Sequence, residues 1–450
     1  MTLLSSHTHT RYTANANPAM TEVPVRIFPA SLHQTGKTQL TPLDLSEALS
    51  LPYPATAPNL LASFIEVKAG ESLETGVEHA TSQSFYVMRG KGSSVTRAGL
   101  VEWSRGDLFV LPYLGDDAPS VCHSSPMVVG RQCVRHVCES DDEFGSCSLY
   151  FVHDEPLLQY LGARPVDTRR FQPAMYVGQA PPAAITLPPL PPFTPPFTPP
   201  FSRTTPPPRH HHHHATTVPH RHLRYPGTVM LETVGNISPV DEFTGEVRNR
   251  RGILLSSQDS TQTKTLTPTL WSLLNSIEAG ATQAPHRHNS VALDLAVVGT
   301  VPSVGGAKGD GTSGGIVYTL LGRELDANGA IVRPLKVEWE SGGVFVTPPG
   351  WWHSHHNEGN STAWVLPMQD AGLYTHQRTL DIRFQAEETQ RLQNGVSRGA
   401  TLDIQKSDIE NKEASKNARE LDEQEGGSET EGDVKPLVAG TIMFGHCGHA

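Results

Sequence analysis

Two histidines separated by a single residue constrain this chain more than any other feature. His286 and His288 lie on a segment that leads into an apolar run. Because side chains of an extended segment alternate between two faces, both imidazoles point the same way. A third histidine, His353, arrives on another segment rich in β-branched and aromatic residues. Three neutral nitrogen donors that converge inside a small barrel hold a divalent transition metal and leave positions open for a substrate.

The spacing around these histidines resembles the paired motifs of the cupin superfamily. The first motif has a glycine, five residues, the His-x-His pair and a later glycine: Gly280, His286, His288, Gly299. The second has a glycine, a Pro-x-Gly step, a histidine and an asparagine: Gly342, Pro348, Gly350, His353, Asn357. The resemblance implies an all-β fold with two cupin barrels of the double-stranded β-helix or jelly-roll type.

Short β-branched or aromatic runs divide the chain into two β-rich parts. Such runs, bounded by Gly, Asp and Pro, are typical of antiparallel barrels. They fill 60–163, which we expect to form the first cupin domain, and 225–385, which we expect to form the second. Residues 1–59 have no sustained period, and we expect an arm that wraps a neighbouring domain or a dimer partner.

Low-complexity and charged segments separate and follow the two barrels. Residues 164–224 contain three Pro-Pro-Phe-(Thr/Ser) repeats and the tract His210–His214, which predict a semi-rigid Pro/His-rich linker. We interpret the histidine tract as low complexity, because unstructured imidazoles impose no geometry on a metal. Residues 386–450 are densely charged and predict a mostly disordered tail.

The sequence of the first barrel resembles that of the second, but the first barrel lacks the metal ligands. Counted back from the motif glycine, His79 lies eleven residues before Gly90, as His288 lies eleven before Gly299. This count puts Val77 at the place of His286. The position where many cupins carry a glutamate ligand holds Gln83, and the third histidine falls on Asp117. We therefore predict a degenerate metal site there.

The composition restricts the classes of binding partner and the cellular compartment that we expect. The formal net charge of −11 argues against nucleic acid or an anionic membrane as a partner. No apolar run reaches the roughly 18 residues of a membrane-spanning helix. Five cysteines, few and odd in number, suit reduced thiols in a cytoplasmic protein. Residues 1–21 carry one arginine and no acid, so an organelle transit peptide stays an alternative. We expect a homo-oligomer.

Alternation extends the predicted inward face beyond the histidines. Ser290, Ala292 and Asp294 share the parity of His288, so we expect the first two to line the substrate pocket. No carboxylate stands where many cupins place a glutamate ligand, so a metal on three imidazoles keeps its full charge. Such a centre favours an anionic chelating substrate.

The segments 286–299 and 347–357 further resemble the gentisate dioxygenase family of bicupins. The resemblance implies Fe2+ on three histidines and O2 as co-substrate. It also implies ring cleavage of a hydroxylated aromatic acid of the gentisate or salicylate type. Two alternatives stay open: another cupin enzyme with Mn2+, Zn2+ or Ni2+, such as a lyase, decarboxylase or hydrolase, and a noncatalytic ligand-binding or storage bicupin.

Other residues near the motifs are candidates for chemistry. Asp294 stands where the family usually has a carboxylate-binding arginine, so we predict either a substrate other than an aromatic acid or a distant extra ligand. His355 keeps the parity of His353 and is a candidate acid or base. Trp351 and Trp352 form either an aromatic pocket wall or core at the barrel mouth. Arg287 should face away from the metal.

Overall fold

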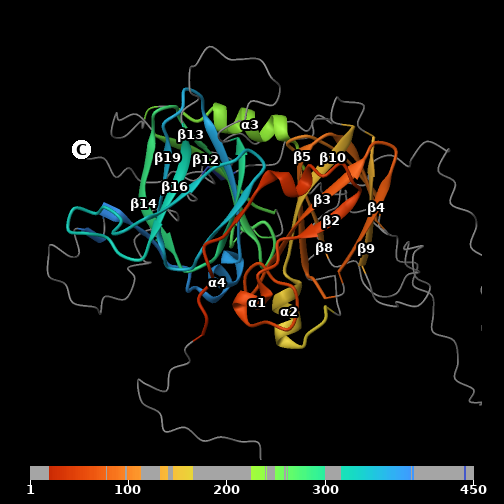
Figure 1. Cartoon of the computed structure of the whole chain (residues 1–450), viewed down its shortest axis with the longest axis horizontal. Helices are drawn as coiled ribbons and strands as arrows, with labels where there is room; N and C mark the ends of the chain where they lie inside the picture. Colours follow the sequence, from red (N-terminus) through yellow and green to blue (C-terminus); the bar gives the residue numbers. More distant parts are fainter. Residues whose placement is uncertain are drawn as a thin grey trace, which may run out of the picture.

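The computed structural model shows two β barrels side by side, with the second barrel on the left of Figure 1 and the first on the right. It describes residues 20–77, 79–96, 99–112, 132–139, 145–165, 224–238, 240, 249–257, 260, 262–298, 316–386, 388–389 and 440–441. The predicted linker and tail therefore lie almost wholly outside the described residues. Asp117 and Gly299 also lie outside them.

The first barrel consists of two antiparallel sheets. Within the described residues, one has six strands in the order β11-β8-β5-β10-β3-β2 and the other four in the order β4-β9-β6-β7. The strands are β2 (Gln39–Pro42), β3 (Leu61–Lys68), β4 (Ser72–Val77), β5 (Ser82–Arg89), β6 (Lys91–Thr96), β7 (Gly99–Ser104), β8 (Leu108–Pro112), β9 (Gln132–Cys138), β10 (Ser146–His153) and β11 (Arg224–Tyr225).

The second barrel repeats this plan. Its described strands form one sheet in the order β1-β18-β15-β20-β13-β12-β22 and another in the order β17-β16-β19-β14-β21. The strands are β1 (Ile27–Phe28), β12 (Arg250–Leu255), β13 (Trp271–Ile277), β14 (Thr282–His288), β15 (Ala292–Val298), β16 (Val317–Gly322), β17 (Leu335–Glu338), β18 (Val344–Thr347), β19 (Trp352–Asn357), β20 (Ala363–Gln369), β21 (Ile382–Phe384) and β22 (Gly440–Thr441).

In each barrel, one edge strand comes from a segment outside that barrel's predicted domain. The early strand β1 pairs with β18 of the second barrel, whereas β11, which begins at the last residue of the predicted linker, pairs with β8 of the first. Both additions cover a sheet edge that would otherwise expose backbone groups. The described helices are short: η2 (Ala30–His33), α1 (Ser46–Leu49), α2 (Glu155–Leu161), α3 (Gly227–Gly235) and α4 (Ala371–Gln377). None of them is long and apolar enough to cross a bilayer.

Three of the four apolar clusters of the described residues account for most of the core. One fills the first barrel and includes Ile65 and Phe151, and another fills the second and includes Val317 and Trp339. A third lies between the barrels and joins residues of both, such as Phe64 and Leu293. Adjacent residues of β3 therefore face different layers. This two-sided burial explains why the central strands are apolar without a clear alternation.

Two buried aspartates occupy equivalent positions in the two barrels. Asp154 follows β10 and accepts a hydrogen bond from the Thr269 hydroxyl of the second barrel, 2.7 Å away. Asp370 follows β20 and accepts one from the Asn59 amide, also 2.7 Å away. Each donor stands two residues before the strand that follows it, β13 or β3. The equivalence supports the predicted duplication of one barrel.

Candidate metal centre

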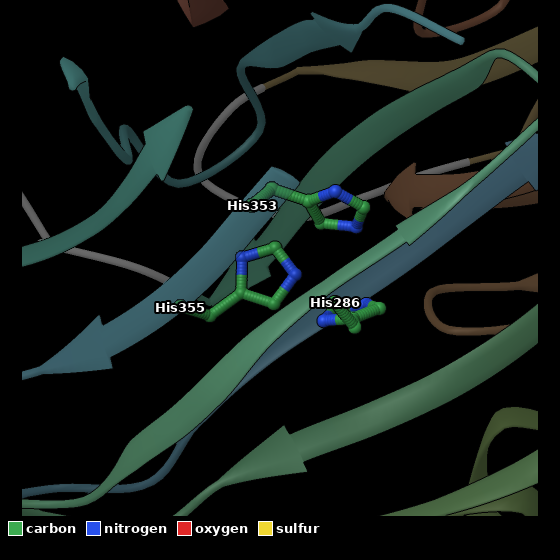
Figure 2. Close-up of side chains that lie close together, drawn as sticks. All are labelled: His286, His353 and His355. Atoms are coloured by element: carbon green, nitrogen blue, oxygen red, sulfur yellow. The ribbon is translucent and has the colours of Figure 1, made fainter. Parts of the chain in front are cut away.

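Four buried imidazoles gather inside the second barrel. His286 and His288 are on β14, and His353 and His355 are on β19. The strands are antiparallel neighbours in which His286 lies opposite His353. The side chains are 3–8% exposed, so the barrel encloses all four. Figure 2 shows His286 close to His353 and His355, the two that share a strand.

The distances single out two overlapping groups of three. The ring nitrogens of His286, His353 and His355 can all lie within 4.8 Å of one another. The predicted group has His288 in place of His355; the ring centroids of His288 and His353 are 4.9 Å apart, and those of His286 and His288 are 6.4 Å apart. The centroids of His286 and His353, which belong to both groups, are 4.0 Å apart.

Backbone carbonyl oxygens determine which ring nitrogen carries the proton in two of the predicted ligands. Nδ1 of His288 lies 2.9 Å from the carbonyl oxygen of Ser290, and Nδ1 of His353 lies 3.0 Å from that of Trp351. A carbonyl only accepts, so these Nδ1 atoms carry the proton and Nε2 keeps a free lone pair. Nδ1 of His286 lies 3.4 Å from the carbonyl oxygen of Ala284. The Gln283 amide nitrogen lies 3.3 Å from the same nitrogen and 3.5 Å from Nε2, so the partners of His286 do not fix which of its nitrogens holds the proton.

His355 has a different kind of partner. Its Nδ1 lies 2.7 Å from the hydroxyl of Thr319, which also accepts a 2.8 Å hydrogen bond from the indole N–H of Trp339. A hydroxyl can donate or accept, so this contact does not fix which nitrogen of His355 holds the proton. His355 can therefore exchange a proton without losing its partner.

Burial keeps all four imidazoles neutral. It lowers the pKa of His288 to about 4 and that of His353 to about 3. It also lowers the pKa of His286 and of His355 well below the ordinary value, with the neighbouring imidazoles adding to the effect. Neutral imidazoles offer their nitrogen lone pairs to a cation at neutral pH, so the donor set fits a divalent transition metal.

A partly buried arginine and a buried aspartate face the same interior. Arg250, at the start of β12, contributes to the lowered pKa of all four imidazoles, so its charge lies close to them. Asp294 is 4% exposed and accepts a 2.6 Å hydrogen bond from the Thr347 hydroxyl. Burial raises the pKa of Asp294 to about 7, against the opposing effects of Thr347 and Arg250.

The remaining predicted pocket residues divide between the two faces of their strands. Ser290 is fully buried; its hydroxyl lies 3.1 Å from Nδ1 of His288 and donates to Gln369, so it supports a histidine. Ala292 is buried next to Thr347 on β18.

Trp352 lies on the face of β19 opposite to His353, because side chains alternate along a strand. Its ring stacks against Arg287. The interpretation of Trp352 as a pocket wall is therefore wrong, whereas Arg287 faces away as predicted.

Trp351 and Asn357 have structural partners. Trp351 packs against the apolar core of the second barrel, and the Arg323 guanidinium covers its ring at 5.1 Å. Asn357 donates to the carbonyl oxygens of Ile277 and Ser361, which makes it a turn residue. The core interpretation of Trp351 thus has direct support.

Strand pairing corrects the predicted alignment of the first barrel. Thr75 lies opposite Val134 on β9, as His286 lies opposite His353 on β19. Thr75, Val77 and Val134 therefore replace the three predicted ligands. His79 lies after the end of β4, 3.6 Å from Glu155, so it is not the counterpart of His288. The ungapped count failed because the turn after β4 is longer than the turn after β14.

One imidazole of the first barrel does have a counterpart in the second. His136 on β9 is fully buried, with Nδ1 2.8 Å from the Ser94 hydroxyl, which in turn accepts a hydrogen bond from the Trp103 indole. This network repeats the one of Trp339, Thr319 and His355. It persists in a barrel that has lost the three predicted ligands, so it forms without a metal centre. The sequence prediction missed both networks, because a lone histidine on a strand carries no spacing signal.

Comparison with known proteins establishes the fold. No protein-family model matches the chain, and no curated protein sequence does. The salicylate 1,2-dioxygenase from Pseudaminobacter salicylatoxidans superposes with a TM-score of 0.50 at 12% sequence identity, covering 83% of this chain and 92% of that one. A deletion variant of Bacillus subtilis oxalate decarboxylase superposes with a TM-score of 0.40 at 15% identity, covering 79% of each chain.

The likeness to the dioxygenase gives the fold of this chain and nothing about its reaction. The chain has a two-domain cupin fold, and the predicted fold class is confirmed. Its organisation into two barrels of like topology agrees with that class. The limits of the five predicted segments remain predictions.

Proposed function

We propose that the second barrel is the metal centre of a non-haem, Fe2+-dependent dioxygenase, in which His286, His288 and His353 hold the metal. The observation that carries this proposal is the orientation of the three imidazoles. His288 and His353 present Nδ1 to backbone carbonyls, so each directs Nε2 to a cation, and the ring of His286 lies 4.0 Å from that of His353. Metal-binding histidines in proteins are commonly oriented by such hydrogen bonds.

The proposed substrate is a hydroxylated aromatic acid of the gentisate or salicylate type, with O2 as co-substrate. When bound, ferrous iron supplies positions for both and passes electrons between them. Three neutral ligands leave the metal with two positive charges, which a chelating phenolate and carboxylate balance. Arg250 adds positive potential in the same interior and favours an anionic substrate.

The residues around the imidazoles have separate tasks in this proposal. The Thr319 hydroxyl holds His355 and lets it take or give a proton at the side facing the cluster. Ser290 orients His288 through its hydroxyl and its carbonyl oxygen. The apolar core around Trp339 and Phe345 keeps bulk water from the reacting groups.

A second candidate is a cupin enzyme that uses Mn2+, Zn2+ or Ni2+ for lyase, decarboxylase or hydrolase chemistry. The proximity of His355 to His286 and His353 favours it, because a fourth nitrogen would close one of the positions that O2 requires. Imidazole donors alone do not select among these metals. A noncatalytic ligand-binding bicupin is the third candidate.

Oxygen consumption separates the candidates. The full-length protein is loaded anaerobically with Fe2+ and mixed with a panel of ortho-hydroxy aromatic acids in an oxygen electrode cell. The proposal expects oxygen uptake with at least one acid and its loss in His353→Ala. Turnover with Mn2+ or Zn2+ and no oxygen uptake supports the second candidate. A His353→Ala protein with unchanged metal content overturns the proposed centre.

A further inference from the structure

Arg250 on β12 and Asp294 on β15 belong to one sheet of the second barrel, in which β13 and β20 lie between their strands, and both face the barrel interior. Ile253 and Leu255 of β12 pack between the barrels, so Arg250 and Gly252 occupy the opposite, interior face. Leu293 and Leu295 likewise pack between the barrels, which puts Asp294 on the interior face of β15. A Cβ at Gly252 would lie 2.1 Å from the Asn275 amide oxygen, so the Asn275 side chain fills this part of the interior face.

The partly buried Arg250 and the buried Asp294 carry opposite charges on the same interior face. The Arg250 charge stabilises the carboxylate of Asp294, and the Asp294 charge stabilises the guanidinium. The Thr347 hydroxyl fixes the carboxylate on the same interior face. Opposite charges interact strongly where the effective dielectric constant is low. Asp294 therefore weakens the positive potential that Arg250 projects onto the imidazoles.

We propose that Asp294 is a specificity-determining residue, which restricts the site to substrates whose only acidic groups are the two that bind the metal. Because its charge offsets that of Arg250, a third anionic group on the substrate is attracted less strongly by the Arg250 guanidinium. The same group meets repulsion from the Asp294 carboxylate, and juxtaposed like charges cost several kcal/mol. The inference rests on the proposed function, since it assumes that the substrate chelates a metal at the three imidazoles.

Binding of two acids that differ by one charge tests the inference without turnover. Salicylate and 5-sulfosalicylate are titrated calorimetrically into the full-length protein, both metal-free and loaded with zinc, which has no redox chemistry. We expect the wild-type protein to bind 5-sulfosalicylate at least about tenfold more weakly than salicylate, a difference of about 1.4 kcal/mol. Asp294→Asn, which keeps an acceptor for Thr347, should reverse that preference by a similar factor.

Two further variants locate the effect and guard against misfolding. The double variant Asp294→Asn, Arg250→Met removes both charges and should lose the gained affinity for 5-sulfosalicylate. Arg250→Met alone leaves the carboxylate in place and should increase the discrimination against 5-sulfosalicylate by about tenfold. An unchanged ratio of the two affinities in Asp294→Asn, or in Arg250→Met where Asp294→Asn does not fold, overturns the inference. Absent oxygen uptake with intact discrimination would instead overturn only the dioxygenase proposal.

Discussion

At the scale of single residues, the hydrogen-bond partners of His288, His353 and His355 distinguish ligands from a proton carrier. His288 and His353 face carbonyl oxygens, which accept only, whereas His355 faces the Thr319 hydroxyl. Proximity alone does not make this distinction, because His355 lies as close to the cluster as His288 does. The chemistry of the partner therefore decides the assignment.

Removing the hydroxyl partner of His355 should affect turnover and leave the metal in place. Thr319→Val deletes the contact to Nδ1 and the acceptor for Trp339, so we expect kcat to fall about tenfold to hundredfold. Metal content, measured by elemental analysis, should stay at the wild-type value. The matched control is Ser94→Ala in the equivalent network of the first barrel, which should leave kcat unchanged. Parallel loss of metal and activity in Thr319→Val would make His355 a ligand.

At the scale of the elements, buried aspartates at the ends of β10 and β20 tie the barrels together. The Asp154 carboxylate accepts hydrogen bonds from the backbone N–H groups of Thr81 and Ser82 and from the Thr269 hydroxyl. Ser82 and Thr269 are buried and Thr81 is partly buried, so deleting the carboxylate leaves donors without a partner away from bulk water. The Asp154 side chain therefore connects the end of β10 and the helix that follows it to the neighbouring barrel.

The cost of losing this carboxylate is measurable by denaturant unfolding. We expect Asp154→Ala to lower the free energy of unfolding by about 3 kcal/mol, since each buried unsatisfied group costs about 1–3 kcal/mol. The control is Asp326→Ala, because Asp326 accepts from two backbone N–H groups in an exposed turn. That variant should lose less than about 1 kcal/mol. Equal losses in both variants would contradict the role of burial.

The short helix η2 contributes a pH-dependent contact between the arm and both barrels. His33 lies 3.1 Å from the Ser148 hydroxyl of the first barrel and 3.1 Å from the Gly342 carbonyl oxygen of the second. Burial lowers its pKa to about 4, so the folded protein prefers the neutral ring. Above the unfolded-chain pKa of about 6.5 both states are neutral and the contact contributes fully.

Acid should weaken this contact between the two pKa values. As the pH falls from about 6.5 to 4, only the unfolded chain takes up the proton, and stability drops by about 3 kcal/mol from this group. Other buried histidines add similar losses, so the measurement is a difference. His33→Gln keeps a polar side chain without titration, and its unfolding free energy should fall less than that of the wild type over this range. Identical pH dependence would contradict the prediction.

At the scale of the whole molecule, the layer between the barrels makes their folding one event. That layer joins apolar residues of both barrels, including Tyr150 and Leu366. We expect a single unfolding transition in denaturant, with fluorescence and circular dichroism coinciding, because neither barrel can open its large sheet alone without exposing this surface. Two separate transitions would show that the barrels are independent.

The sequence predicted the fold well because strand composition and motif spacing are local properties. The extended segment predicted to carry His286 and His288 is β14, and the second segment predicted to carry His353 is β19. The alternation rule also put Asp294 on the interior face, where the structure has it. Each of these features depends on neighbours in the chain.

Residues that meet through tertiary packing could not be predicted in this way. Arg250 lies 36 positions before His286, and only the pairing of β12 with β13 aligns its strand with the barrel interior. The networks of His355 and His136 likewise depend on strands that are distant in sequence. The misplaced His79 has the same cause, since the length of a turn changes which residues face each other.

Metal content of four single variants tests the central claim most directly. His286→Ala, His288→Ala, His353→Ala and His355→Ala are loaded with Fe2+ anaerobically, desalted and analysed for iron per chain. The account predicts that the first three lose their iron and that His355→Ala keeps it. Iron retained by His288→Ala and lost by His355→Ala would contradict it.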